Sequence, residues 1–186
     1  AALDRGGGHA HIRHEGWVTE EMNRRRVAYL EDPAQLDPAK RAAGIDGIVP
    51  GGQLHRCGSI ATRIADPDAF AMAIARGVEH PDVRAALETK FQDKRSPAYV
   101  VLPIADVLGS DGHRYCTGWQ LDAAGGSLKA AREQRDAWTK TADGPEPRAR
   151  PVETFDGGTI MFIFGPNRER NGYEIVTMYV NPPDRD

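Results

Sequence analysis

The sequence predicts an α+β fold, in which N-terminal helices pack on a twisted antiparallel sheet. Two observations indicate this. A helix signature comes early in the chain, the middle is mixed, and two apolar, β-rich segments close the chain at 159–164 and 173–180. The polar stretch between those segments, GPNRERNG, ends in Asn-Gly, which is typical of a turn between antiparallel strands.

The helices are predicted from their start signals. Thr19 can cap a helix over 20–30, whose first turn carries two glutamates that suit the helix dipole. Asp66, followed by Pro67 at the first helical position, opens a second helix, which we expect Gly77 to terminate. Further helices are expected at 81–91, after Pro81 as its first residue, and at 128–138, after Ser127 as its cap.

Apolar and β-branched segments predict the strands, which we expect at 58–64, 98–104, 113–121, 159–164 and 173–180. The turn GSDG at 109–112 suggests that 113–121 returns along 98–104, with Pro103 at an edge or at the end of its strand. The continuous apolar run TIMFIF at 159–164 is typical of a central strand.

The length of 186 residues is enough for one domain with a sizeable core, and we expect a single domain over 1–186. Residues 1–8 end in a glycine run and are expected to form an exposed junction. Because the chain begins without methionine, we expect it to be a segment of a longer polypeptide. Residues 139–158 are rich in proline, glycine and charge, which predicts a mobile loop.

Composition narrows the classes of function. No apolar run is long enough to cross a bilayer. The formal net charge of −3 argues against a large phosphate-binding surface, although it is compatible with a small cationic site. Cys57 and Cys116 are too few for a disulfide scaffold, and neither lies in a CxxC motif, so no structural zinc site is expected. They can form one disulfide if the fold brings them together.

The segment GGGHAHIRHEGW places His9, His11 and His14 within six residues. Three interpretations are open. Metal binding is disfavoured because the chain has no HExxH motif and no paired carboxylates at metal-ligand spacing, so we expect no metal. A solvated polar loop is the plain alternative. Acid–base chemistry is the third, since an imidazole changes charge near neutral pH and can both take and give a proton.

The last predicted strand carries two hydroxyl side chains at alternate positions. Alternate residues of a strand share a face, which places Tyr173, Ile175, Thr177 and Tyr179 on one side. Thr177 and Tyr179 would then stand about 6.5–7 Å apart along the strand. Threonine and tyrosine are common in strands by propensity alone, so this pattern does not define a site by itself.

Three regions together resemble the bacterial RNase A-like toxin domains found at the C-terminal ends of contact-dependent and polymorphic toxins. The stretch GHAHIRHEG at 8–16 is similar to the family pattern GHxxxRHxG. The second histidine of that pattern corresponds to His14, and Arg25 follows it by eleven residues. SIATR at 59–63, before an alanine-rich helix, is similar to the family's middle strand. TMY at 177–179 is similar to the Thr-x-Tyr of its last strand. The resemblance does not cover 31–56 or most of 92–150.

The resemblance implies an RNase A-like fold with an enlarged central insertion, and a metal-independent ribonuclease without a cofactor. The 2′-oxygen of RNA would attack the adjacent phosphate, giving a 2′,3′-cyclic phosphate and a free 5′-hydroxyl. His14 would be the main proton-transfer residue, and Arg25 would stabilise the charge on phosphorus. Thr177 and Tyr179 would supply hydroxyls. The expected substrate-binding residues are His9, Arg13 and Arg24.

The same resemblance implies an RNA substrate, with tRNA as one candidate, and a cognate immunity protein as partner. It further implies secretion or delivery as a toxin fragment that acts in the cytoplasm of a target cell. Two other functions stay open from the residues alone. One is a non-enzymatic domain whose histidine loop contacts a partner protein, and the other is a different toxin enzyme such as an ADP-ribosyltransferase.

Overall fold

A computed structural model describes residue 14 and residues 17–33, 57–91, 96–142, 144–167 and 172–183. The architecture is α+β, as predicted. Two compact units make up the chain. Unit 1 comprises Ala1–Trp17, Arg63–Cys116 and Thr154–Asp186, and unit 2 comprises Val18–Thr62 and Thr117–Glu153. Compactness does not by itself decide the number of domains, so the single domain stays a prediction.

Unit 1 contains a three-stranded antiparallel sheet in the order β2-β5-β6, formed by Ala98–Pro103, Thr159–Asn167 and Gly172–Asn181. Its helices are α4 (Pro67–Glu79), α5 (Pro81–Phe91), α6 (Ile104–Leu108) and the short 3-10 helix η3 (Gly112–Tyr115). The central position of β5 confirms the prediction from its continuous apolar run. Pro103 ends the edge strand β2, where its missing N–H costs no ladder hydrogen bond.

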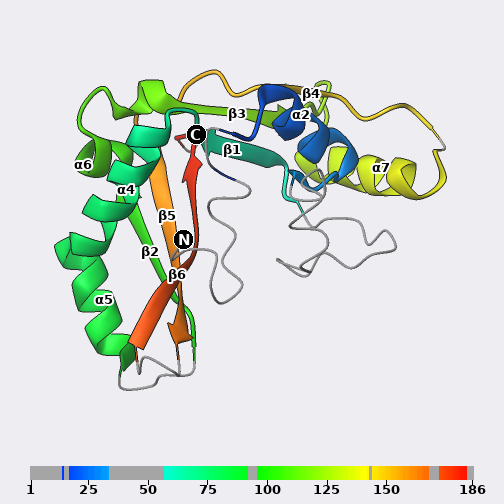
Figure 1. Cartoon of the computed structure of the whole chain (residues 1–186). Helices are drawn as coiled ribbons and strands as arrows, with labels where there is room; N and C mark the ends of the chain where they lie inside the picture. Colours follow the sequence, from blue (N-terminus) through cyan, green and yellow to red (C-terminus); the bar gives the residue numbers. More distant parts are fainter. Residues whose placement is uncertain are drawn as a thin grey trace. The chain divides into compact units, whose positions relative to one another are not determined.

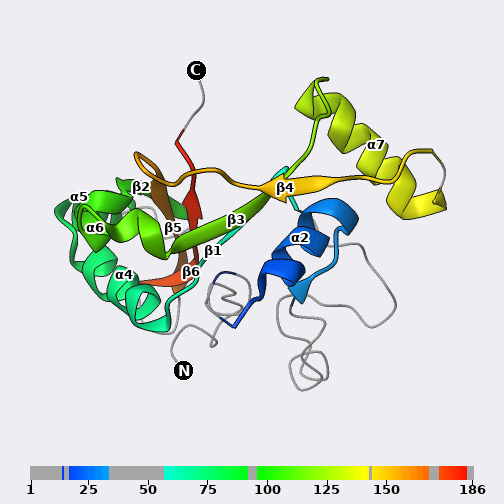
Figure 2. The same cartoon turned by 90° about the horizontal axis from the view of Figure 1, so that it is seen from above.

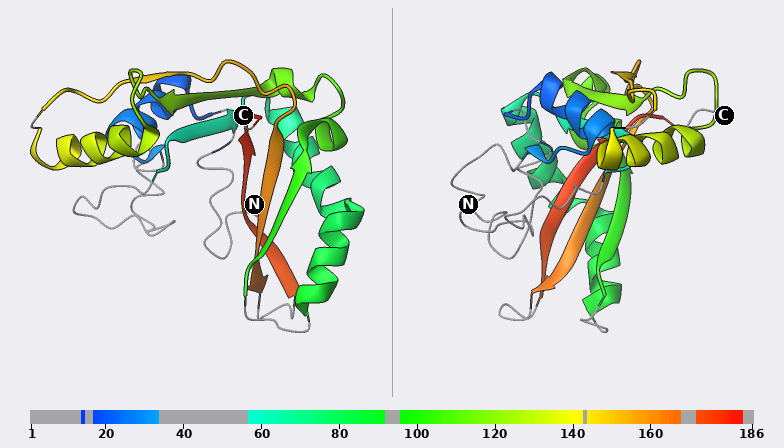
Figure 3. Two further views of the ribbon diagram at one scale, coloured as in Figure 1. Left: turned by 180° about the vertical axis from the view of Figure 1, so that it is seen from behind. Right: turned by 90° about the vertical axis from the view of Figure 1, so that its right-hand side faces the viewer.

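One face of this sheet forms the core of unit 1, and α4 and α5 cover it (Figure 1 and, from behind, Figure 3). The buried strand residues alternate along the chain: Ala98, Val100 and Leu102, then Ile160, Phe162 and Phe164, then Met178 and Val180. We call the opposite side of the sheet the outer face. The alternation therefore fixes which side chains reach the outer face.

The prediction that Gly77 terminates α4 is wrong. The helix continues past the glycine to Glu79. The glycine instead lets the helix approach the sheet. A Cβ atom at Gly77 would lie 2.2 Å from Cζ of the Phe162 ring. The absent side chain is thus a requirement of helix–sheet packing.

The predicted pairing of 113–121 with 98–104 is wrong. β2 pairs with β5, whereas β3 (Cys116–Leu121) belongs to the other sheet. The reason lies directly after β2, where Ile104, Val107 and Leu108 are buried at helical spacing. Burying them requires the helix α6, which redirects the chain before a hairpin can form.

Unit 2 holds α2 (Glu20–Tyr29), α7 (Leu128–Thr141) and β4 (Ala149–Pro151), and the second sheet has the order β1-β3-β4, with β1 at Ile60–Ile64 (Figure 2). The boundaries between the units fall within β1 and β3. Thr19 caps α2 as predicted, since its hydroxyl accepts from Met22 N at 3.2 Å. The predicted loop at 139–158 begins inside α7 and includes β4.

A buried arginine ties the elements of unit 2 together. Arg135 of α7 is 3% exposed and donates to the carbonyl oxygens of Val27, Cys57 and Gly58 at 3.2, 3.2 and 2.7 Å. Asp136 accepts from its Nε at 3.0 Å. One guanidinium therefore joins α7 to the last turn of α2 and to the residues before β1.

Cys57 and Cys116 are both free thiols. Burial raises the pKa of the Cys116 thiol to about 12.

None of the helices in the described part of the chain has the length and apolar character needed to cross a bilayer.

Candidate functional site

The outer face of the unit 1 sheet carries the candidate site. Its central side chains form two cross-strand rows, Tyr99–Ile163–Thr177 and Val101–Met161–Tyr179. Tyr99 and Val101 are exposed, and Thr177 is buried. The predicted neighbours Thr177 and Tyr179 therefore do share one face, at alternate positions of β6.

A β-bulge changes which other residues of β6 join them. Thr177 lies opposite Ile163, but Ile175 lies opposite Phe164, so Val176 is an extra residue in the register. Opposed residues point to the same side of a sheet, and Phe164 points into the core. Ile175 therefore faces away from Thr177, as does Tyr173. The prediction that these two share the face of Thr177 and Tyr179 is wrong, because a bulge reverses the alternation.

The bulge depends on a glycine in the partner strand. A Cβ atom at Gly165 would lie 2.7 Å from Cγ2 of Val176, so Val176 occupies the space that any larger residue would need. Beyond the bulge, Glu174 lies opposite Gly165 and accepts a hydrogen bond from Asn167 Nδ2 at 2.8 Å. The bulge thereby brings one carboxylate onto the outer face, at the end remote from Tyr179.

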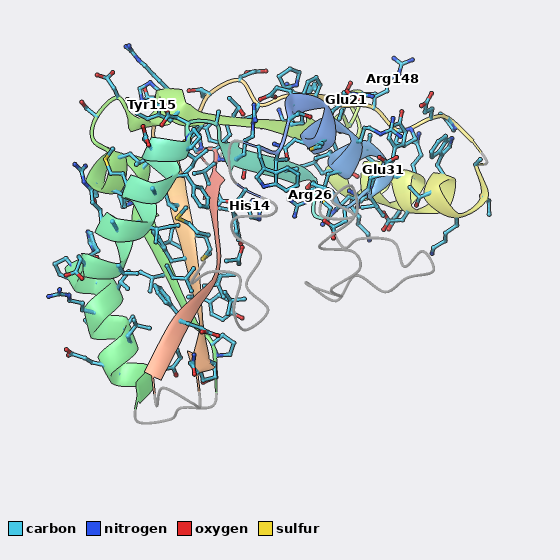
Figure 4. All side chains as sticks on the ribbon, in the orientation of Figure 1. His14, Glu21, Arg26, Glu31, Tyr115 and Arg148 are labelled. Carbon is cyan, nitrogen blue, oxygen red and sulfur yellow. The ribbon has the colours of Figure 1, made fainter. Side chains whose placement is uncertain are left out.

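His14 packs against Tyr179. The two ring centroids are 5.5 Å apart and the ring planes are tilted by 33°. His14, labelled in Figure 4, is 7% exposed, so this imidazole is a buried side chain of unit 1. The structure thus brings together one histidine from the start of the chain and one tyrosine from its end, as the sequence predicted.

Thr177 carries a hydroxyl that no described residue satisfies. The side chain is 4% exposed, and Oγ1 has no hydrogen-bond partner within the described structure. A buried hydroxyl without a partner costs about 1–3 kcal/mol. Asn23 and Gln120 also carry buried amide atoms without a partner among the described residues, but Thr177 is the one of these three that shares its face with Tyr179, where a ligand could satisfy the hydroxyl.

Tyr179 remains a hydrogen-bond donor at neutral pH. Burial raises the pKa of its phenol above the ordinary value, and the nearby phenol of Tyr99 raises it further. The hydroxyl is therefore protonated throughout the physiological range. It can donate to an anionic oxygen or deliver a proton to a strongly basic leaving oxygen.

The two arginines of the predicted site belong to unit 2 and are engaged by carboxylates. Arg25 donates from Nε to Glu31 Oε2 at 2.7 Å and from Nη2 to Oε1 at 2.5 Å. This pair raises the pKa of Arg25. Arg24 donates from Nε and Nη2 to the two oxygens of Glu21, each at 2.7 Å.

Figure 4 labels both glutamates at α2, Glu21 within the helix and Glu31 just after it. Both guanidiniums thus already hold the bidentate partner that a phosphate would have to replace. The predicted meeting of Arg25 with His14, Thr177 and Tyr179 stays a prediction.

Two further residues predicted to bind the substrate, His9 and Arg13, lie outside the described residues, so their roles also stay predictions. Within the described ranges, no group of three or more His, Cys, Asp or Glu side chains could hold a metal ion.

Sequence reasoning missed Tyr99. The segment AYVVLP predicts only an apolar strand, yet its observed burial alternates strictly from buried Ala98 to exposed Pro103. A tyrosine at the second position of this strand already indicates the exposed side, because alternate residues of a strand face opposite sides of the sheet.

The chain matches no protein-family model, and comparisons with curated proteins and with solved structures also give no match.

Proposed function

We propose that the protein is a metal-independent ribonuclease that cleaves RNA by attack of the 2′-oxygen on the adjacent phosphate. The observation that supports this most is the pairing of the His14 and Tyr179 rings, 5.5 Å apart, beside the unsatisfied hydroxyl of Thr177. One general base, one protonated phenol and one free donor are the groups that this reaction needs. The family resemblance of the sequence supports the same reaction.

In the proposed mechanism, His14 takes the proton from the 2′-hydroxyl as the 2′-oxygen forms its bond to phosphorus. The bond from phosphorus to the 5′-oxygen then breaks, and Tyr179 gives its proton to that leaving oxygen. Solvent carries the proton from His14 back to the phenolate, which restores both groups. Thr177 donates to a non-bridging phosphate oxygen, where negative charge increases in the transition state.

Arg25 is proposed to stabilise charge on phosphorus, with His9, Arg13 and Arg24 as contacts to the RNA. Because Glu31 holds Arg25 through two hydrogen bonds, the phosphate would have to displace a carboxylate. We therefore expect a smaller loss of activity from Arg25→Ala than from substitution of His14. The 2′-hydroxyl requirement explains why RNA and not DNA would be cut.

The biological setting follows from the resemblance. We propose that the protein is a toxin fragment, secreted or delivered to act in the cytoplasm of a target cell, with RNA as substrate and tRNA as one candidate. A cognate immunity protein would be its partner.

The experiment is cleavage of total RNA with EDTA present, by the wild type and by His14→Ala and His14→Gln. Glutamine keeps a polar side chain in the buried position and cannot transfer protons as an imidazole does. The matched control is His80→Gln. His80 lies in the same unit, between α4 and α5, where its Nδ1 accepts from Asp82 N at 3.2 Å.

We expect wild type and His80→Gln to fragment RNA at the same rate and both His14 variants to be inactive although each still unfolds in a cooperative melting transition, with His14→Ala melting lowest because it leaves a cavity beside Tyr179. Intact RNA with the wild type would overturn the proposal. Consumption of NAD by the wild type would point instead to the transferase alternative.

A further inference from the structure

Two large side chains are exposed on the outer face next to the proposed site. Tyr99 is 62% exposed and Val101 is 50% exposed, at alternate positions of β2. The other large exposed hydrophobic residues in the described chain, Ile60, Tyr115 and Leu128, lie on three different elements. The outer face thus carries two exposed apolar side chains at alternate positions of one strand, which offer a partner a small apolar surface to contact.

The register places this surface within reach of the proposed reaction. Tyr99 stands in the same cross-strand row as Thr177, two strands away, which is about 10 Å at the usual strand spacing. Val101 stands in the row of Tyr179. Tyr99 also lies close enough to Tyr179 for its phenol to raise the pKa of Tyr179. About 10 Å is comparable with the separation of a phosphate from the base of an adjoining nucleotide.

The chemistry of the two rows suits single-stranded RNA. The rows contain two tyrosines, one threonine and three aliphatic or thioether side chains, without a carboxylate. Among the described strand residues of this face, the carboxylate of Glu174 lies beyond the bulge, where it accepts a hydrogen bond from Asn167. A phosphate at Thr177 would therefore meet no like charge within the rows. Flat aromatic rings on a sheet surface are a common platform for unpaired bases.

We propose that Tyr99 stacks an unpaired nucleobase of the RNA whose reacting phosphate lies at Thr177 and Tyr179. This inference rests on the proposed function, because it takes the phosphate position from it. It assigns the substrate class as single-stranded RNA, since a base within a duplex cannot present its face to a side chain. Val101 supplies apolar contact beside the stacked base, and Tyr99 is a specificity-determining residue that takes no part in proton transfer.

The test measures binding separately from cleavage. The probe is a single-stranded oligonucleotide with 2′-fluoro sugars, which lacks the attacking hydroxyl, and with 2-aminopurine as a fluorescent base. The variants are Tyr99→Ala, Tyr99→Phe and, as the control, Tyr115→Ala. Tyr115 is likewise an exposed tyrosine of unit 1, but it lies in η3, outside the sheet. Because Tyr99 is exposed, its variants should fold as the wild type does, and melting curves check this directly.

We expect Tyr99→Ala to weaken binding roughly 5- to 100-fold and to abolish the fluorescence quenching caused by stacking. Tyr99→Phe should keep both, because the ring face is retained, and Tyr115→Ala should match the wild type. The same loss should appear as a raised KM for cleavage, with kcat less affected.

The outcomes separate this inference from the proposed function. If RNA cleavage requires His14 but Tyr99→Ala binds the probe as tightly as the wild type, the stacking role is wrong and the ribonuclease stands. If the wild type binds the probe in a Tyr99-dependent way but cleaves no RNA, stacking stands and the enzyme does not. If the wild type neither binds nor cleaves, both are overturned, and a protein partner for the outer face becomes the interpretation.

Discussion

Thr177→Val should stabilise the protein and reduce its activity at the same time. Thr177 is 4% exposed and its Oγ1 has no hydrogen-bond partner among the described residues. Valine has almost the same shape without the hydroxyl, so the substitution removes a penalty of about 1–3 kcal/mol for burying that group. In a chain of 186 residues, each kcal/mol raises Tm by about 2–4 °C. Loss of one donor to the transition state should lower kcat/KM about 100-fold.

The assay combines calorimetry with RNA cleavage, and Thr177→Ser is the matched control. Serine keeps the hydroxyl and removes a buried methyl group, which costs about 1 kcal/mol. Of the two variants, we therefore expect the valine variant to be more stable than the wild type and much less active, and the serine variant to be less stable than the wild type but nearly as active. A valine variant that melts below the wild type would show that the hydroxyl is satisfied, and one that cleaves RNA normally would show that it is not used. Either result would refute the reasoning.

Three further predictions concern the supporting structure. Gly165→Ala should cost about 1–3 kcal/mol of unfolding free energy by crowding Val176, and Val176→Ala should restore most of that loss, which urea titration of the single and double variants checks. At pH 8.5, iodoacetamide should alkylate Cys116 roughly a thousandfold more slowly than an ordinary thiol, because its pKa of about 12 leaves little thiolate, and rapid labelling seen by mass spectrometry would contradict this. Arg135→Met should destabilise unit 2 by about 3 kcal/mol by leaving three carbonyl groups without their donor, and a urea midpoint equal to the wild type would rule that out.

The elements with local signals could be predicted from the sequence. Thr19, Asp66 and Ser127 each accept a hydrogen bond from the helix they precede, so the cap residue alone located those helices. The antiparallel pairing of β5 with β6 also followed from local signals, because two β-rich runs flank a turn sequence. Such signals depend on a few neighbouring residues and survive in any tertiary setting.

Features set by tertiary contacts could not be predicted in this way. From the sequence, Gly77 looks like a helix terminator. In the structure, the Phe162 ring, 85 positions further along the chain, occupies the space that a side chain at Gly77 would need. The bulge at Val176 depends on space that Gly165 provides in the partner strand, so alternation read from one strand alone assigned Tyr173 and Ile175 to the wrong face.

The candidate site was predicted in part. His14 and Tyr179 meet, and Thr177 shares their side of the molecule, because strand alternation holds on the C-terminal side of the bulge. Arg25 is implied by the family resemblance, through its spacing from His14, and that spacing does not show that Glu31, six residues later, holds it. Tyr99 was missed because its importance depends on which strand pairs with β5.

The chemistry of the RNA ends is the measurement that tests the central claim most directly. Fragments produced with EDTA present would be analysed by mass spectrometry, for the wild type and for His14→Gln. The account predicts 2′,3′-cyclic phosphate and 5′-hydroxyl ends from the wild type and no fragments from the variant. Fragments with 5′-phosphate ends, or identical fragments from His14→Gln, would contradict it.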